Sequence, residues 1–155
     1  MSGIRDLATI LATLDPELLD GEYVFCTLPD AKLSDLLHLD FIGCFREREG
    51  LTVVLRVESA VENSFPFTLA LRCIVLNVHS DLAAVGLTAA VAVALTNAGI
   101  SANIIAAFHH DNIFVPAGDA QRALEVLQSL QRSSQISSSE TEPVEQDVST
   151  AKQHR

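Results

Sequence analysis

The longest apolar run of the chain lies in its second half. Residues 82–95 (LAAVGLTAAVAVAL) are apolar except for Gly86 and Thr88. A helix of this composition has no polar face to turn toward water, so we expect other layers of protein to cover it. The run is shorter than the roughly 20 residues that a membrane-spanning helix needs. The pattern therefore predicts a buried helix, and Gly99 stands where a glycine typically ends one.

Segments rich in β-branched and aromatic residues lie on both sides of this helix and predict β-strands. They cover residues 22–28, 41–47, 51–58, 67–78, 101–109 and 112–115. Gly50 favours a hairpin turn at residues 48–50, because glycine accepts a positive φ. A second tight turn is expected at His110 and Asp111, since Asp tolerates unusual backbone angles. We therefore expect an antiparallel hairpin on each side of the helix.

Apolar residues at helical spacing predict two further helices. The first stripe is Ile4, Leu7, Ala8, Leu11 and Leu14, and the second is Ala120, Ala123, Leu124, Leu127 and Leu130. Residues 29–40 hold one or two helical turns, and residues 59–66 form a short connection. From residue 131 the composition changes to Ser, Thr, Gln and Glu. Residues 131–155 then cannot bury enough apolar surface to fold, which predicts a disordered tail.

The amino-acid composition limits the kinds of binding partner and the cellular compartment that we expect. The 155 residues are 48% hydrophobic, which is enough for a sizeable core, and 20 acidic residues face 10 basic ones. No cluster of Lys and Arg occurs, so we expect neither nucleic acid nor a membrane as a partner. No secretory signal is present, which predicts a cytoplasmic protein. The three cysteines, Cys26, Cys44 and Cys73, are widely separated and fit reduced core thiols.

The polar residues before the apolar helix, His79, Ser80 and Asp81, are the first candidates for a binding site. The first amides of a helix lack internal acceptors and attract anions such as an α-carboxylate. We expect residues 81–87 to supply these amides. Ser80 either caps the helix or touches a ligand. Asp81 either binds an α-ammonium group or serves the helix dipole, and it repels a carboxylate.

Other polar clusters have competing interpretations. His79, His109, His110 and Asp111 suggest a metal, but adjacent residues of a strand point to opposite faces, and no known ligand spacing accompanies them. We therefore predict no metal site. Arg46, Glu47 and Glu49 form either a solvated, ion-paired turn or part of a pocket at an interface.

Three strings carry a resemblance to a known family: RE-x-EGLT at residues 46–52, VHSxLxAVGLTAA at residues 78–90 and HDxIFVP at residues 110–116. Together with the β-α-β-β-α order, they resemble a family of small tandem ACT-domain proteins from bacteria and fungi. That family is related to the ACT domains of the eukaryotic cytosolic arginine sensor. The resemblance covers about residues 4–130 and departs from the family's usual pattern at Asp81, often Ser, and Asn112, often His.

The resemblance implies an α+β fold of ferredoxin-like ACT units in tandem, with antiparallel sheets and helices packed on one face. It divides the chain into a degenerate N-terminal ACT unit (residues 1–66), a C-terminal ACT unit (67–130) and the tail (131–155). Because no strand follows residue 130, the units must share or exchange strands, with residues 22–28 or 67–78 completing the partner sheet. ACT units pair side by side and bind small effectors near the first loop. The implied ligand-binding residues are His79, Ser80, Asp81, Leu82, Val85, Gly86, Leu87, His110, Asp111, Arg46 and Glu47.

No signature of an enzyme accompanies these residues: there is no nucleophile elbow, phosphate-binding loop or dinucleotide fingerprint, and no cofactor is expected. We predict a non-catalytic regulatory or sensor protein that binds a small molecule, an amino acid by preference, and that forms a homodimer or docks onto another protein. One alternative is a structural adaptor or dimerisation module without a ligand. The other is a small hydrolase or isomerase that uses His109 or His110.

Overall fold

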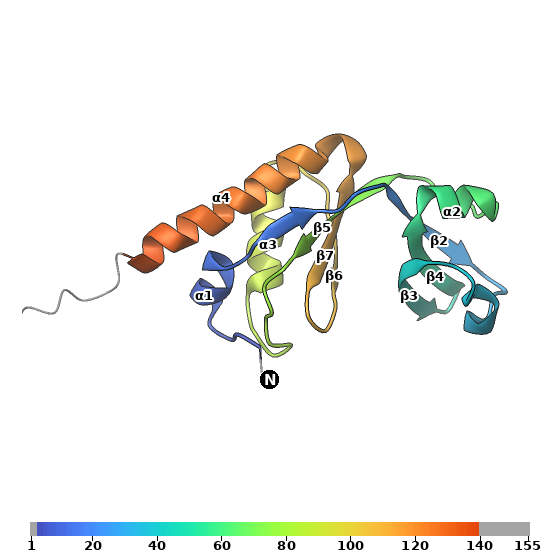
Figure 1. Cartoon of the computed structure of the whole chain (residues 1–155), viewed down its shortest axis with the longest axis horizontal. Helices are drawn as coiled ribbons and strands as arrows, with labels where there is room; N and C mark the ends of the chain where they lie inside the picture. Colours follow the sequence, from blue (N-terminus) through green and yellow to red (C-terminus); the bar gives the residue numbers. More distant parts are fainter. Residues whose placement is uncertain (1–2, 140–155) are drawn as a thin grey trace, which may run out of the picture.

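The computed structural model describes residues 3–139, which fold around one curled antiparallel sheet with the strand order β3-β4-β2-β5-β7-β6, while β1 pairs with β5 beside β2 (Figure 1). The elements are α1 Leu7–Ala12, β1 Pro16–Leu18, β2 Tyr23–Leu28, η1 Leu33–Leu36, β3 Phe41–Glu47, β4 Gly50–Arg56, α2 Val57–Glu62, β5 Leu71–Leu76, α3 Leu87–Asn97, β6 Asn103–Ala106, β7 Asp111–Pro116, η2 Ala117–Asp119 and α4 Ala120–Ser139.

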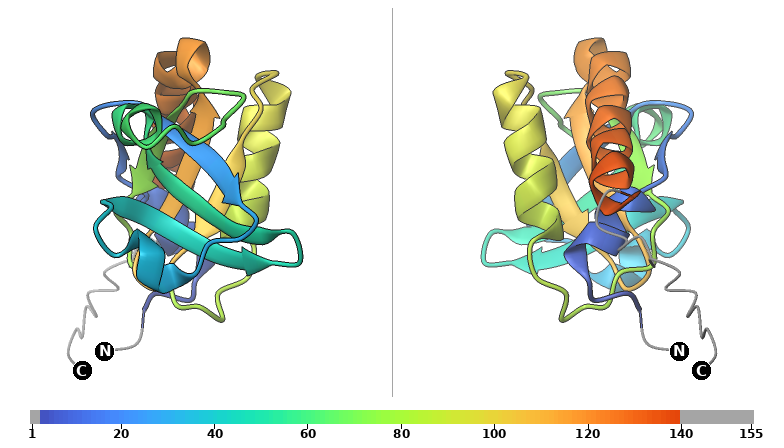
Figure 2. Two further views of the ribbon diagram at one scale, coloured as in Figure 1. Left: turned by 90° about the vertical axis from the view of Figure 1, so that its right-hand side faces the viewer. Right: turned by 90° about the vertical axis from the view of Figure 1, so that its left-hand side faces the viewer.

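The C-terminal half of the sheet has the order β1-β5-β7-β6, and helices α1, α3 and α4 lie on one of its faces (Figure 2). Alternate residues of β5 and β7 point into this layer, as the two-residue period of a strand requires. The buried core there includes Ile10, Leu14, Ile74, Leu76, Val91, Leu95, Ile113, Val115 and Leu127.

The N-terminal half consists of β3, β4 and β2, with α2 packed against β2 and β4. Its own core contains Val24, Cys26, Leu36, Leu51, Val53, Leu55 and Ala60. Both halves therefore place their helices against one side of their strands and leave the other side of the strands free of helices.

The two halves are joined by strands that run from one into the other. β1 pairs with β5 from Pro16↔Leu76 to Leu18↔Ile74, and the same chain continues into β2, where Tyr23 pairs with Leu71. Residues 67–78 were predicted to complete a partner sheet, and β5 does reach β2 at this one pair. The strand that completes the C-terminal half, however, is β1, which the sequence pattern did not predict.

The predicted boundary between the two domains at residue 66 stays a proposal. In packing, α1 and β1 from the N-terminal segment belong to the C-terminal half, because Ile10 and Leu14 are fully buried in its core.

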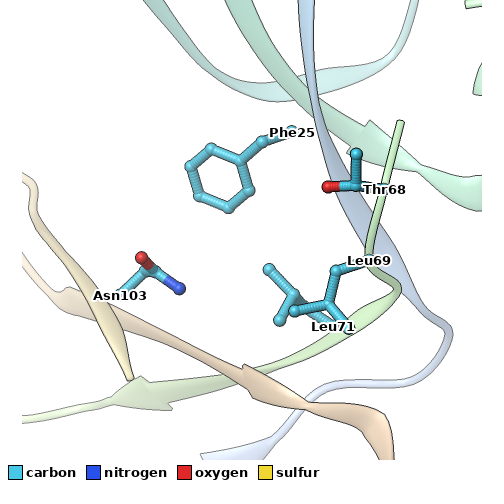
Figure 3. A pocket seen from close by; sticks show the side chains of 5 residues that line it. All are labelled: Phe25, Thr68, Leu69, Leu71 and Asn103. Carbon is cyan, nitrogen blue, oxygen red and sulfur yellow. The ribbon is translucent and has the colours of Figure 1, made fainter. Parts of the chain in front are cut away.

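The helix-free faces of the two halves meet in a third apolar cluster formed by Tyr23, Val54, Leu71, Cys73 and Phe114. The Phe114 ring contacts Phe25 edge-on at a centroid distance of 5.2 Å and Tyr23 at 6.2 Å. Beside this junction lies a pocket whose lining residues come from both halves (Figure 3).

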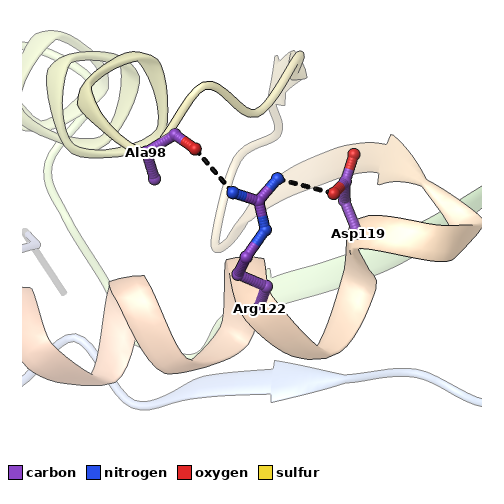
Figure 4. Close-up of polar contacts among 3 residues, drawn as sticks. All are labelled: Ala98, Asp119 and Arg122. Atoms are coloured by element: carbon purple, nitrogen blue, oxygen red, sulfur yellow. Dashed lines mark hydrogen bonds and ion pairs between the residues drawn. The ribbon is translucent and has the colours of Figure 1, made fainter.

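The helices α3 and α4 are fastened to each other by Arg122 (Figure 4). Its Nη1 donates to the carbonyl oxygen of Ala98 at 2.7 Å, and its Nη2 lies 2.7 Å from Oδ1 of Asp119. Ala98 is the C-terminal cap of α3, and a positive charge there is favourable because the last carbonyl groups of a helix carry partial negative charge.

Several predicted boundaries were wrong. The apolar helix does not start at Leu82: residues 82–86 are loop, and α3 runs from Leu87 to Asn97. The first half of the expected connection at residues 59–66 belongs to helix α2, whose Ala60 is buried against the N-terminal sheet. The second tight turn lies at residues 107–110, so that Asp111 is the first residue of β7.

The predicted disorder from residue 131 onward was wrong for residues 131–139, which continue α4. Polar side chains stabilise this part without burying apolar surface. Nε2 of Gln135 donates to the carbonyl oxygen of Ala12 at 2.8 Å, and Ser133 Oγ donates to that of Leu130 at 2.9 Å. The rest of the predicted tail, residues 140–155, lies outside the described residues.

Two of the three cysteines are buried in the core, as the sequence predicts, while Cys44 is only partly buried. Cys26, Cys44 and Cys73 are free, and Cys26 and Cys73 are buried. Burial raises the pKa of the Cys73 thiol to about 12, which makes it a poor nucleophile. Within the described residues, none of the helices is both long and apolar enough to span a membrane.

Candidate functional site

The loop between β5 and α3, residues 77–86, contains most of the predicted ligand-binding residues and is held in place by the N-terminal segment. Ile4 N donates to the carbonyl oxygen of His79 at 2.9 Å, and Asp81 N donates to that of Ile4 at 2.8 Å. Gly3 is packed so closely that a Cβ on it would lie 2.5 Å from Asp81 N. The N-terminal segment therefore forms one wall of this loop.

Asp81 organises the loop through contacts of both carboxylate oxygens. Its Oδ1 accepts a hydrogen bond from Ala83 N at 2.8 Å, and its Oδ2 lies 3.2 Å from Nε of Arg5. These two contacts, the Ala83 amide first, lower the pKa of Asp81. The interpretation of Asp81 as a dipole partner in the first helical turn was wrong, because the helix begins six residues further on. Its interpretation as a partner for an α-ammonium group stays a prediction.

The helix α3 begins later than the sequence predicts, so its N-terminal cap is also a different residue. The N-terminal cap is Gly86, at φ +106°, and no side chain accepts a hydrogen bond at this cap. Ser80 is therefore not the cap, and the first helical amides belong to Leu87, Thr88 and Ala89 instead of residues 81–86. A left-handed cap of this kind suits glycine, and it leaves these amides without a side-chain acceptor.

The apolar residues predicted to bind a ligand, in the loop and at the start of α3, lie either in the core or at the surface. Leu87 is buried in the C-terminal core, which gives it a structural role. Leu82 and Val85 are 69% and 83% exposed. They stand at the surface beside the start of α3.

The hairpin between β6 and β7 meets the loop through two histidines. The ring centroids of His79 and His109 are 4.9 Å apart, and His109 also contacts the exposed ring of Phe108 at 4.9 Å. His109 was considered from the sequence only as a metal ligand or catalytic group, and its packing against His79 was not predicted. The contact brings the loop and the hairpin tip, with His110 and Asp111, to the same end of the sheet.

Asp111 is the most unusual polar residue of this region. It is only 7% exposed, and within residues 3–139 no hydrogen bond or ion pair reaches its carboxylate. It pairs in register with Leu76, where β5 ends and the loop to α3 begins. It shares a strand face with Ile113 and Val115, so it lies on the side covered by the helices.

Burial raises the pKa of Asp111, and the nearby charge of His110 opposes this shift only in part. The Nδ1 atom of the neighbouring His110 is fully buried and has no hydrogen-bond partner in the described residues. Buried polar groups without partners are uncommon, and a carboxylate with a perturbed pKa in such a place is a typical functional candidate.

Replacing Asp111 by Asn is expected to stabilise the ligand-free protein at neutral pH. Because the folded-state pKa is raised above its ordinary 3.8, the folded protein binds this proton more tightly than the unfolded chain. The free energy of unfolding should therefore fall as pH rises from 3.8 through the folded-state pKa. Urea unfolding at about pH 7 should give a higher midpoint for Asp111→Asn, and the difference should disappear near pH 3. A lower midpoint at neutral pH would mean that the carboxylate stabilises the fold.

Within one chain, Arg46 and Glu47 lie away from this end of the sheet. They lie at the end of the edge strand β3, which β4 and β2 separate from β5. Both are exposed, and Glu47 contacts the hydroxyl group of Thr52 on the neighbouring strand. Within one chain, the structure does not bring them to the β5–α3 loop. Within the described residues there is also no group of three or more His, Cys, Asp or Glu side chains that could hold a metal ion.

Comparisons with known proteins agree with this architecture. An ACT domain model matches residues 2–72, and a second ACT domain model matches residues 69–129. A Vibrio cholerae protein of unknown function, described as a possible transport protein, is 48% identical, with a TM-score of 0.74 and coverage of 84% of this chain and 99% of its own. No match was found among curated protein sequences.

More distant structures share the fold alone. The ligand-free regulatory subunit of aspartate kinase from Thermus thermophilus is 12% identical, with a TM-score of 0.54 over 74% of this chain and 95% of its own. Aspartokinase III from E. coli, in complex with aspartate and ADP, is 14% identical, with a TM-score of 0.58 over 74% of this chain and 32% of its own. The predicted α+β fold is confirmed, and the chain belongs to the ACT domain family, with two ACT domains in tandem.

Proposed function

We propose that this tandem ACT protein is a regulatory or sensor protein that binds an amino acid at the end of the sheet where the β5–α3 loop meets the β6–β7 hairpin. The observation that carries the proposal is Asp111, a residue that is only 7% exposed and whose carboxylate has no hydrogen-bond partner in residues 3–139. An α-ammonium group would supply the missing positive charge. ACT domains are typically regulatory modules that bind small molecules, which supports this choice of ligand class.

The α-carboxylate of the amino acid also has suitable binding partners at this end of the sheet. The amides of Leu87, Thr88 and Ala89 open α3 without a side-chain acceptor, and such a helix start favours a carboxylate. Asp81 would oppose an anion there, but Arg5 compensates its charge. His79, Ser80 and His110 would then line the site, while Arg46 and Glu47 could reach it only from a second copy of the chain.

A regulatory role is favoured over catalysis because both matched models are ACT domains, and neither indicates a catalytic domain. Of the two aspartokinase structures that share the fold, one is a regulatory subunit, and the other was solved with aspartate and ADP. Cytoplasmic location, homodimer formation and the relation to the eukaryotic arginine sensor stay predictions.

Thermal-shift measurements with each common amino acid test this proposal. A true ligand at one hundred times its Kd should add about 2.7 kcal/mol to the free energy of unfolding, which raises Tm by roughly 5–10 °C. Asp111→Asn should weaken binding by about 30-fold, because loss of a buried charge partner costs about 2 kcal/mol or more. The same variant is expected to stabilise the ligand-free protein, so lost binding cannot be mistaken for lost folding. If no amino acid raises Tm in well-folded protein, the proposal fails.

The alternative function, a docking or dimerisation module without a ligand, rests on the exposed apolar side chains around α3. Val93 is 58% exposed on its outer face, and Leu82 and Val85 lie exposed before its start. If Val93→Asp splits a dimer seen by light scattering while no amino acid binds, the adaptor function is the better account. The matched control is Val61→Asp, since Val61 is 61% exposed on α2 in the other half.

A further inference from the structure

A pocket of about 290 Å³ opens between the two ACT domains (Figure 3), on the side of the strands that carries the third apolar cluster. It is lined by Phe25 of β2, Thr68 and Leu69 before β5, Leu71 of β5 and Asn103 of β6. Asn103 pairs with Phe114, whose ring lies in the cluster that joins the helix-free faces. The pocket therefore lies across the sheet from Asp111 and the start of α3, and it is independent of the amino-acid site proposed above.

One wall of the pocket is a fixed aromatic surface. The Phe25 ring is held edge-on against Phe114, at an interplanar angle of 85°. Leu69, 52% exposed, and the buried Leu71 stand opposite this ring in Figure 3. These side chains offer a flat apolar contact on one side and a branched one on the other, a combination that suits a planar ring.

The polar groups of the pocket are neutral. The Thr68 hydroxyl and the Asn103 carboxamide point toward the same space in Figure 3, and neither makes a hydrogen bond to the described part of the protein. A carboxamide offers both donors and an acceptor, so it pairs well with another amide. No charged side chain lines the pocket, and the chain carries a net charge of −10, which disfavours an anion there.

We propose that this pocket binds a small uncharged molecule that has a planar ring and an amide-like hydrogen-bonding edge. The volume supports this size, since a protein cavity of about 150 Å³ already binds benzene. A second copy of the chain is a poorer fit, because a stable protein interface covers about 800 Å² on each partner. A ligand in this place would contact both ACT domains at once and would stabilise their junction.

Benzamide is a suitable probe, because its ring can contact Phe25 and its amide can pair with Asn103. With so few atoms, a Kd of about 1 mM is expected. Titration of the full chain, followed by NMR, should shift the methyl signals of Leu69 and Leu71 and the side-chain amide of Asn103. Benzoate, which has the same shape and a negative charge, should bind at least about tenfold more weakly.

Two variants make the test specific. Asn103→Ala removes an exposed carboxamide and should weaken benzamide binding about fivefold or more. Gln121→Ala removes an exposed carboxamide from α4, on the opposite side of the sheet, and should leave binding unchanged. The proposal is overturned if benzamide gives no shifts at about 10 mM. It is also overturned if the strongest shifts lie away from Leu69, Leu71 and Asn103, if benzoate binds equally well, or if Asn103→Ala has no effect.

Discussion

Replacing Phe114 by Ala should lower the free energy of unfolding by about 3–5 kcal/mol, the cost of removing a large side chain from a packed core. Phe114 is 1% exposed, and its ring contacts both Phe25 and Tyr23 where the two ACT domains meet. Removal of the ring therefore eliminates packing contacts inside the C-terminal sheet and also between the domains. Urea unfolding followed by circular dichroism measures the change in the free energy of unfolding.

Phe108→Ala is the matched control, because Phe108 is 66% exposed at the tip of the β6–β7 hairpin. Its replacement should cost less than about 1 kcal/mol, as surface substitutions usually do. Equal losses for the two variants would contradict the structure at this junction. A Phe114→Ala protein that unfolds in two steps would show that the cluster couples the two domains.

Gly50→Ala should cost about 3 kcal/mol, because two unfavourable effects coincide at this position. The residue has a φ of +139°, and a Cβ would lie 2.5 Å from both the Leu28 carbonyl oxygen and Pro29 Cα. Those neighbours are backbone atoms, which cannot rotate away as a side chain can. Thermal and urea unfolding should both show the loss.

Gly118→Ala provides the comparison, since a Cβ there meets nothing within 4 Å and the backbone is not in the left-handed region. Its effect should stay within about 0.5 kcal/mol. If Gly50→Ala were equally harmless, the hairpin between β3 and β4 could not have the close approach to Leu28 and Pro29 that the structure contains.

The fold could be predicted from the sequence where local pattern and long-range pairing agree. The run from Phe41 to Arg56 has β-branched and aromatic residues on both sides of a glycine turn, and it forms the hairpin of β3 and β4. The three-residue β1 shows no such pattern, because it contains a proline and becomes a strand only by pairing with β5, far away in the chain. Local periodicity carries no information about such a partner.

The apolar run at residues 82–95 shows a second limit of the sequence pattern. Hydrophobic composition does not distinguish a helix from an exposed apolar loop, so Leu82 and Val85 were assigned to the helix. In the structure, the bond from Ala83 N to Asp81 closes a local turn that competes with helix formation. The left-handed Gly86 then sets the true start of α3.

The candidate site could be predicted in part. The loop at His79 and the hairpin residues His110 and Asp111 were named from motif positions, and the contact between His79 and His109 brings these segments together. Their supporting contacts could not be predicted, since Arg5 and Gly3 come from the N-terminal segment, far from the loop in sequence. The interdomain pocket has no local signal, because Phe25 and Asn103 meet only through the tertiary fold.

The most direct test of the account is an NMR titration of the full chain with the amino acid that gives the largest thermal shift. We predict that the strongest changes occur at the backbone amides of Leu87, Thr88 and Ala89 and at Asp111, and that Asp111→Asn raises the ligand concentration needed for them about 30-fold. Saturable binding whose strongest changes lie elsewhere, or binding that survives Asp111→Asn unchanged, would contradict the account.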